Sequence, residues 1–449
     1  MSVTSGEERG ANGGEVCAGM ELRVLAAEAR TAVEAFVRGH ASTGAELFLA
    51  AGRRLTLEYE VHTRAFTVSQ GESVSVAARV WRGEHSGFMA LPVSEPGDLG
   101  RVLAAAEQRM GTSPSLAPAA VSAPAGLAPP WLPALSVERA RHQAERLART
   151  VIPSGVVVQA AVLTRSESWS ALVRGEGGAW GGSSSREEAF VRCETSRGAV
   201  VDAVAAPSAE EWDLEAFRAR LAEAVEALEG PAEAVDVGLP LVLRPAVAAP
   251  LVAALAWMMG GEVAASTPAL ARMVGKKLFP SVLSVGDEPL HPLGTQRRSM
   301  DDEGLPSRPL RLVEEGRLQG FLHSAGTAAR LGVEPNGRGL RTELAPPAPA
   351  PVNLFVLPRG DALPERYTEL VARVETFTTM PRPGTVGMVA GGWECQGGRR
   401  MRRLAPVDLS LPVLETFRVL RGVGADLAFF PTAEGCGTPT LLFPPLLGR

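Results

Sequence analysis

The first half of the chain runs twice through the same order of predicted elements: a helix, a series of strand-like runs, and a second helix. Apolar residues at helical spacing open the first series at residues 20–38 and close the second at 213–229. The runs between the helices are short, and Gly and charged pairs separate them, as in an antiparallel meander. Because an amphipathic helix must bury its apolar stripe on another layer, this order predicts sheets that helices cover on one face.

Each series has a distinct set of expected elements. The first has strands at 45–50, 55–61, 65–70 and 73–81, and its closing helix at 98–110. The second opens with a helix that Ser136 caps, and continues with strands at 156–163, 169–174, 188–194 and 199–204.

Shifts in composition divide the chain. Residues 1–18 form a polar, Gly-rich tail that we expect to be disordered, and residues 111–134 form a Pro- and Ala-rich linker. The segment 229–238 separates an N-terminal α+β domain, 19–230, from a β-rich C-terminal domain, 237–449. The C-terminal domain has predicted strands at 239–244, 310–314, 318–322, 352–357, 385–390 and 405–409, and predicted helices at 248–259, 327–331 and 363–379. The predicted fold class is therefore a two-domain α+β protein.

Charge argues against a nucleic-acid partner. The 449 residues carry a formal net charge of −5, which does not suit a protein held on nucleic acid by bulk positive charge. The basic patch at 399–403 has four arginines but no interleaved aromatic residue, so a solvated face or a protein contact explains it better.

Hydropathy and cysteine spacing argue against a membrane or secreted protein. The unbroken apolar run 251–259 has nine residues, whereas a membrane span needs about 20. The four cysteines lie far apart without a CxxC pair, and the first residues lack the apolar core of a signal peptide. We expect a cytoplasmic protein.

Familiar catalytic motifs are missing from the sequence. It contains no HExxH, HExxxH, GxSxG or P-loop, and the six histidines are too dispersed for two of them to share one helix face. One segment, 300–345, is nevertheless distinctive. It reads as an acidic DDEG turn, a hairpin at EEG, a short helix and a Gly-rich PNGRG loop.

This segment resembles the TldD/PmbA family, whose members are metallopeptidase-like proteins also described as modulators of DNA gyrase. Other landmarks agree in order: PLVLRPAVAAPLVAAL at 240–255, KKLFPSVLSVGDEP at 276–289, VAGGWECQGG at 389–398 and EGCGTPTLLF at 434–443. The resemblance covers residues 240–443 well, whereas residues 20–230 match only in layout. It implies a TldD/PmbA-like two-domain fold.

Active members of the family carry HExxxH on the helix after the strand at 239–244, where two histidines hold zinc and the glutamate activates water. The resemblance places Ala253 and Ala254 at the first histidine and the glutamate, and Met258 at the second histidine. Methyl groups and a thioether cannot hold zinc. Cys436 matches a late cysteine ligand, but without the histidines a small buried apolar residue is the better interpretation.

The resemblance therefore implies the PmbA or TldE type, which lacks the motif. We expect a non-catalytic subunit without a cofactor of its own, because zinc would sit only in a separate TldD-like partner. The pair would enclose unfolded or leader peptides and bind them as an added strand for proteolysis. Two alternatives stay open: a self-sufficient peptidase or peptide-modifying enzyme that uses the DDEG turn or Cys436, and a homodimeric peptide-binding scaffold.

Several residues are candidates for the peptide groove or a subunit interface. The acidic turn could bind a cation or a peptide amine, and its other interpretation is a solvated turn in which Asp caps backbone N–H groups. The candidates are Asp301, Asp302, Glu303, Gly304, Asn336, Gly337 and Cys436.

Overall fold

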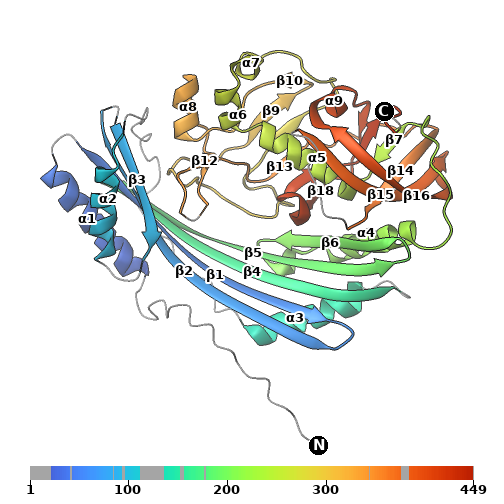
Figure 1. Cartoon of the computed structure of the whole chain (residues 1–449), viewed down its shortest axis with the longest axis horizontal. Helices are drawn as coiled ribbons and strands as arrows, with labels where there is room; N and C mark the ends of the chain where they lie inside the picture. The colour runs from blue at the N-terminus through green and yellow to red at the C-terminus, as the bar shows by residue number, and fades with distance from the viewer. Residues whose placement is uncertain are drawn as a thin grey trace, which may run out of the picture.

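The structure is a computed structural model, which describes residues 22–40, 43–83, 85–93, 97–111, 136–151, 156–175, 178–342, 344–375 and 384–447. The N-terminal part is one curved, antiparallel six-stranded sheet in the order β3-β2-β1-β4-β5-β6 (Figure 1). Its strands are β1 (Gly44–Glu60), β2 (Ala65–Arg82), β3 (His85–Pro92), β4 (Val157–Arg174), β5 (Ala179–Thr195) and β6 (Gly198–Ala206). The predicted tail and all but the first residue of the predicted linker lie outside the described residues.

The strands are longer than the sequence predicts. The runs expected at 45–50 and 55–61 are the single strand β1, and the pairs expected at 65–81 and 156–174 are likewise the single strands β2 and β4. Pairing continues through the polar middle of β1 because Gly52 lies between Ser73 and Ser168, and Arg53 pairs with Glu167 on β4. Pairing with the neighbouring strands thus continues through the residues at which the sequence predicts a break between two strands.

Three helices cover the outer face of this sheet (Figure 1). Helices α1 (Leu22–Gly39) and α2 (Asp98–Gln108) share one apolar cluster with β1, β2 and β4, and α3 (Val137–Val151) packs on Leu55 and Leu57. The prediction of a sheet covered on one face is therefore confirmed. The fourth helix, α4 (Leu214–Leu228), packs against β6 and also against strands of the C-terminal part, so it joins the two parts.

Two further six-stranded sheets form the C-terminal part, in the orders β16-β15-β14-β7-β20-β17 and β10-β9-β8-β13-β19-β18. Helix α5 (Pro245–Met258) packs against strands of both sheets. The first sheet has β7 (Leu241–Leu243), β14 (Arg366–Arg373), β15 (Thr385–Gln396), β16 (Arg399–Pro412), β17 (Gly422–Val423) and β20 (Leu441–Phe443). The second has β8 (Val285–Asp287), β9 (Leu310–Glu314), β10 (Arg317–Leu318), β13 (Leu354–Val356), β18 (Ala428–Phe430) and β19 (Cys436–Thr438).

Shorter elements complete this part. They are α6 (Gly261–Ser266), α7 (Pro268–Ala271), α8 (Ala325–Leu331), α9 (Val413–Arg418), β11 (Gly339–Leu340) and β12 (Ala348–Pro349), with 3₁₀ turns at Ala209–Glu211 and Pro431–Ala433. No helix among the described residues is both long enough and apolar enough to cross a membrane.

The prediction of a helix at 363–379 is wrong, because the described part of this segment contains the strand β14. β14 pairs with β15 on one side and, in parallel, with β7 on the other. Six consecutive residues, 367–372, are buried on both faces of the sheet. A strand buried on both faces has no alternation of polarity, so its apolar run can be read as a helix. Residues 376–379 of the predicted helix lie outside the described residues.

Candidate functional site

The helix that resembles the family's metal helix is α5, and its three motif positions are apolar. Ala253, Ala254 and Met258 are partly buried and pack against the main apolar cluster of the C-terminal part. Strand β19 packs alongside α5, so Cys436 lies in the same cluster. The fold therefore brings the cysteine and the helix together, as the resemblance implies.

The donors at this place do not fit zinc. Alanine has no donor atom, and a thioether is a soft ligand that suits Cu(I) better. Burial raises the pKa of the Cys436 thiol far above its ordinary value, which disfavours the thiolate that a metal needs. No group of three or more His, Cys, Asp or Glu side chains within the described ranges could hold a metal ion. We therefore derive no chemical step through a metal in this chain.

The acidic turn is buried, which corrects the expectation that it is solvated. Asp301, Asp302 and Glu303 are each at most 2% exposed. Asp301 accepts N–H donations from Glu303 and Leu305 at 3.0 and 2.8 Å, and from Gly339 at 3.0 Å, so its predicted role as a cap is confirmed. Burial raises the pKa of Asp301 to about 7, despite these donors.

Asp302 and Glu303 face the N-terminal sheet. Asp302 accepts from both terminal nitrogens of Arg298 at 3.2 Å and from the backbone N–H of Arg341 at 2.8 Å. Glu303 lies 3.6 Å from Arg79 of β2 and accepts the Ala325 N–H at 2.6 Å. Burial raises the pKa of Glu303. Gly304 follows with a φ of +79°. The turn is thus a contact within the chain between its two parts.

Glu46 on β1 is the centre of this contact. Its carboxylate lies 2.7 Å from Arg79, 2.8 Å from Arg174 and 3.4 Å from Arg341. Burial opposes ionisation of Glu46, but the three arginines outweigh it and lower its pKa. Sequence reasoning missed this cluster. A signal was present, since Glu46, Arg79 and Arg174 are charged residues at the ends of apolar strand runs.

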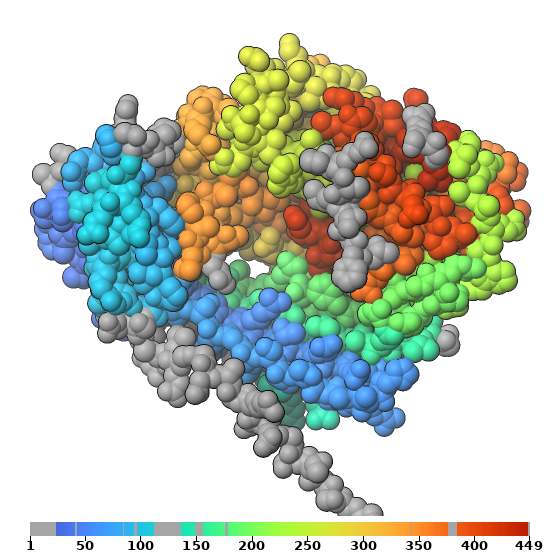
Figure 2. Space-filling model, in the orientation of Figure 1, coloured from blue at the N-terminus to red at the C-terminus, as the bar shows by residue number. Residues whose placement is uncertain are grey.

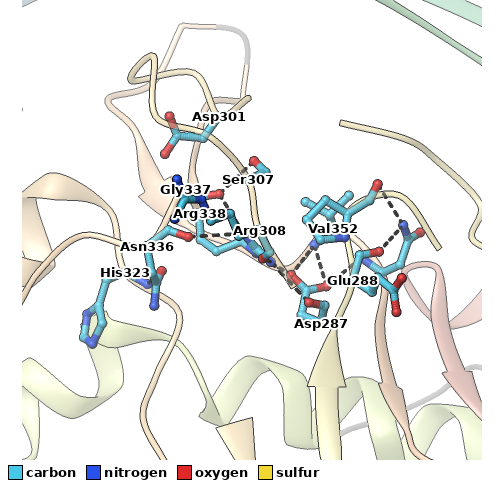
Figure 3. A network of polar contacts seen from close by, with 12 residues as sticks. Asp287, Glu288, Asp301, Ser307, Arg308, His323, Asn336, Gly337, Arg338 and Val352 are labelled. Atoms are coloured by element: carbon cyan, nitrogen blue, oxygen red, sulfur yellow. Dashed lines mark hydrogen bonds and ion pairs between the residues drawn. The ribbon is translucent and has the colours of Figure 1, made fainter. Parts of the chain in front are cut away.

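The Gly-rich loop holds the remaining predicted residues (Figure 3). Asn336 accepts the His323 N–H and donates to the Phe321 carbonyl, both at 2.8 Å, so it ties the loop to the chain beside α8. Gly337 has a φ of +71°, and a Cβ there would lie 2.3 Å from the Pro306 carbonyl oxygen. These two residues shape the loop, and they do not contact Cys436 in any described hydrogen bond.

A cavity of about 280 Å³ lies between the inner face of the sheet and the segment 298–344. Figure 2 shows the molecule hollowed between the sheet and the C-terminal part. We call this space the central cavity. Strands β1, β2 and β4 line one side of it, and Arg298, Asp302, Arg341 and Leu344 line the other. The predicted candidate Asp302 therefore borders the cavity, whereas Cys436 does not line it.

The predicted basic patch at 399–403 is largely neutralised. Arg400 pairs with Glu369 at 3.0 Å and also with Glu223, and its guanidinium lies 3.9 Å above the ring of Trp393. Arg402 pairs with Glu233 at 2.7 Å and with Glu394 at 2.5 Å. Arg400 and Arg402 therefore form ion pairs with carboxylates of the same chain.

Comparison with known proteins agrees with this architecture. Residues 238–446 match the family described as the PmbA/TldA metallopeptidase C-terminal domain. A metalloprotease from Synechocystis sp. is 26% identical over 170 residues, which cover 36% of this chain and 36% of that protein. The chain thus spans about a third of the length of this curated relative.

Solved structures share the fold along nearly the whole chain. A proposed modulator of a DNA gyrase from Thermotoga maritima superposes with a TM-score of 0.76 at 18% identity, covering 94% of this chain and 99% of that one. TldE from Thermococcus kodakarensis superposes with a TM-score of 0.75 at 18% identity, covering 93% of this chain and 98% of that one. A second proposed modulator of DNA gyrase, from Bacteroides thetaiotaomicron, superposes with a TM-score of 0.70 at 12% identity, covering 94% of this chain and 97% of that one. The predicted α+β fold of this type is confirmed.

Proposed function

Because the chain belongs to the TldD/PmbA family, we propose that it is the PmbA- or TldE-like, non-catalytic subunit of a two-chain zinc peptidase. In this role it helps to enclose and bind extended peptides, and the zinc-bearing TldD-like partner cleaves them. Unfolded segments or leader peptides are the proposed substrates.

The observation that carries the proposal is the chemistry of α5. The helix and the strand of Cys436 lie together as the resemblance implies, yet Ala253, Ala254 and Met258 fill the motif positions and pack into the apolar core. Without the two imidazoles, most of the ligands that would bind zinc are missing. Packing contacts cannot replace the binding energy that these ligands supply. The helix therefore stabilises the fold without supplying a reaction centre.

The central cavity supports a binding role that does not need the metal. Residues from both parts of the chain line it, and its floor is a sheet of small and polar side chains. An extended peptide that is held through its main chain asks little of its own side chains. Such binding would persist after the metal ligands are lost.

A self-sufficient enzyme that uses Cys436 fits less well. The thiol is 1% exposed in an apolar cluster, and its raised pKa favours the unreactive protonated form. No described hydrogen bond joins it to a histidine or a carboxylate that could act as a base.

Purification of this chain alone, of an HExxxH-bearing TldD-like chain from the same genome, and of the two together tests the proposal. We expect a stable complex that hydrolyses unstructured peptides and is inhibited by a chelator, while this chain alone shows no hydrolysis. The matched control replaces the glutamate of the partner's motif by Gln, which should abolish turnover but leave the complex intact. Chelator-sensitive hydrolysis by the isolated chain would refute the proposal, and a homodimer that ignores the partner would favour a scaffold.

A further inference from the structure

The inner face of the N-terminal sheet changes character along its strands. The register places Arg79, Glu46 and Arg174 in one cross-strand row, and the next inward-facing row holds Ala77, Phe48, Leu172 and Trp180. Two rows of small or hydroxyl side chains follow. They contain Ser75, Ala50, Ser170 and Gly182, and then Ser73, Gly52, Ser168 and Ser184. The central cavity lies over the apolar row and these two rows.

Arg341 lies at the border between the charged row and the cavity. Its guanidinium carbon is 4.6 Å from the centre of the Phe48 ring and 3.4 Å separates its Nη2 from the Glu46 carboxylate. The side chain is 2% exposed and lines the cavity. Its Nε and Nη1 are buried and have no hydrogen-bond partner among the described residues. A buried guanidinium N–H without a partner has lost its hydrogen bonds to water, and no protein group replaces them.

Charge around Arg341 favours a negative ligand. Four arginines share this region with three carboxylates: Arg79, Arg174, Arg298 and Arg341 against Glu46, Asp302 and Glu303. Asp301, next to Asp302 in the chain, is partly protonated at neutral pH because burial raises its pKa to about 7. Asp302 also borders the cavity, but both terminal nitrogens of Arg298 already bind it. A carboxylate that entered beside Arg341 would therefore meet unpaired N–H groups.

We propose that the central cavity is a carboxylate subsite, in which an unpaired N–H of Arg341, at Nη1 or Nε, binds a carboxylate of an extended peptide while serine hydroxyls of the sheet floor contact the adjoining residue. The inference deepens the proposed function, on which the identity of the ligand as a peptide rests. The volume of about 280 Å³ is just below the roughly 300–1,000 Å³ of pockets for drug-sized ligands, so it suits the end of a chain. A hydrogen bond from a charged guanidinium N–H to a carboxylate is stronger than one between neutral groups, and its direction orients the ligand.

Binding of a matched peptide pair tests the subsite. The probes are one N-terminally labelled, unstructured hexapeptide with a free C-terminal carboxylate and the same peptide as its C-terminal amide, measured by anisotropy with the full chain. We expect the acid to bind about 10- to 100-fold more tightly than the amide, as for a charged hydrogen bond. Arg341→Met should bring the ratio to about 1. Arg399→Met, at an exposed residue of the β15–β16 hairpin, should leave it unchanged.

A third probe separates the two sources of a carboxylate. It is the amide peptide with Glu as its last residue. If it binds like the free acid, the subsite takes an acidic side chain, and if it binds like the plain amide, the subsite takes the C-terminus. Equal binding of acid and amide by the wild-type chain, or a ratio that survives Arg341→Met, overturns the inference.

Thermal unfolding with sodium acetate or inorganic phosphate, against chloride at equal ionic strength, keeps this inference distinct from the proposed function. Stabilisation by these anions that Arg341→Met abolishes, without binding of any peptide, supports the anion subsite and counts against the peptide function. The inference is overturned if the chain shows neither a preference for the acid peptide nor stabilisation by these anions. Arg341→Met should fold, since Glu46 keeps Arg79 and Arg174. If it does not, Ser75→Leu fills the cavity without touching the ion cluster and should abolish both effects.

Discussion

Arg338 and Asp287 form an ion pair in which both side chains have no exposure to solvent (Figure 3). Arg338 also donates to the carbonyl oxygens of Asn336, Gly337, Asp287 and Arg308, at 2.7 to 3.2 Å. The Asp287 carboxylate accepts the N–H groups of Val352 and Asn353 at 2.7 to 3.2 Å. The pair thus ties the Gly-rich loop to β8 and to the segment before β13. It fixes the backbone that leads directly into Arg341.

Removal of the Arg338 charge should destabilise the protein strongly. Arg338→Met keeps most of the side-chain volume but leaves the Asp287 carboxylate buried without a counter-ion, so we expect the free energy of unfolding to fall by about 3–5 kcal/mol. Urea unfolding measures the change, and Arg399→Met, at an exposed arginine, is the control that should shift stability by less than about 0.5 kcal/mol. A loss below about 1 kcal/mol for Arg338→Met would show that the pair is not needed for this loop.

Gly337 and Gly398 offer a matched test of the close approach in the Gly-rich loop. Both have a positive φ, +71° and +74°, but a Cβ at Gly337 would lie 2.3 Å from a backbone oxygen, whereas at Gly398 it would meet nothing within 4 Å. Gly398→Ala should cost about 1–2 kcal/mol of stability through its backbone conformation alone. Gly337→Ala should cost clearly more, because the Pro306 carbonyl must also move. Equal losses in urea unfolding would mean that the loop can shift freely.

The helices of the N-terminal part could be predicted closely from sequence, and the strands only in part. Helix α4 covers 214–228 against a predicted 213–229, because its apolar residues recur at a period that only a helix satisfies. The strand β14 was predicted as a helix because it is buried on both faces. The gaps expected inside β1, β2 and β4 are absent because register with neighbouring strands extends through polar residues.

The candidate site was predictable where it follows local motifs. The DDEG turn and the NGRG loop lie side by side, joined by the bond from Gly339 to Asp301. The burial of the turn was not predictable, since it depends on Arg79 and Arg174 of the N-terminal sheet. Glu46 and Arg341 are 295 positions apart in sequence, and only the docking of the two parts brings them together.

The contribution of Asp301 to stability should decrease as the pH rises from about 4 to about 8. Its pKa is raised by burial to about 7 from an ordinary value of 3.8, so the folded chain binds this proton more tightly than the unfolded chain does. The contribution is therefore fully present below pH 3.8 and is lost as the pH rises through 7. Asp301→Asn should remove this contribution, so the slope of the free energy of unfolding against pH should become more positive across this window. Asp408→Asn, at an exposed aspartate, should leave the slope unchanged, and an unchanged slope for Asp301→Asn as well would refute the assignment.

Stability should not respond to zinc, because the side chains on α5 do not offer zinc ligands. We expect the Tm of the purified, untagged chain to change by less than about 1 °C on treatment with EDTA or on addition of 100 µM zinc, in the absence of the partner. A site saturated at about a hundred times its Kd would stabilise the fold by about 2.7 kcal/mol, which corresponds to a shift of roughly 3 °C for a chain of 449 residues that unfolds as one unit. The variant Ala253→His, Ala254→Glu, Met258→His restores donors beside Cys436 and should gain a zinc-dependent rise in its own Tm. A fall of several degrees when EDTA is added to the wild-type chain, reversed by zinc, would contradict the interpretation of α5 as a packing helix.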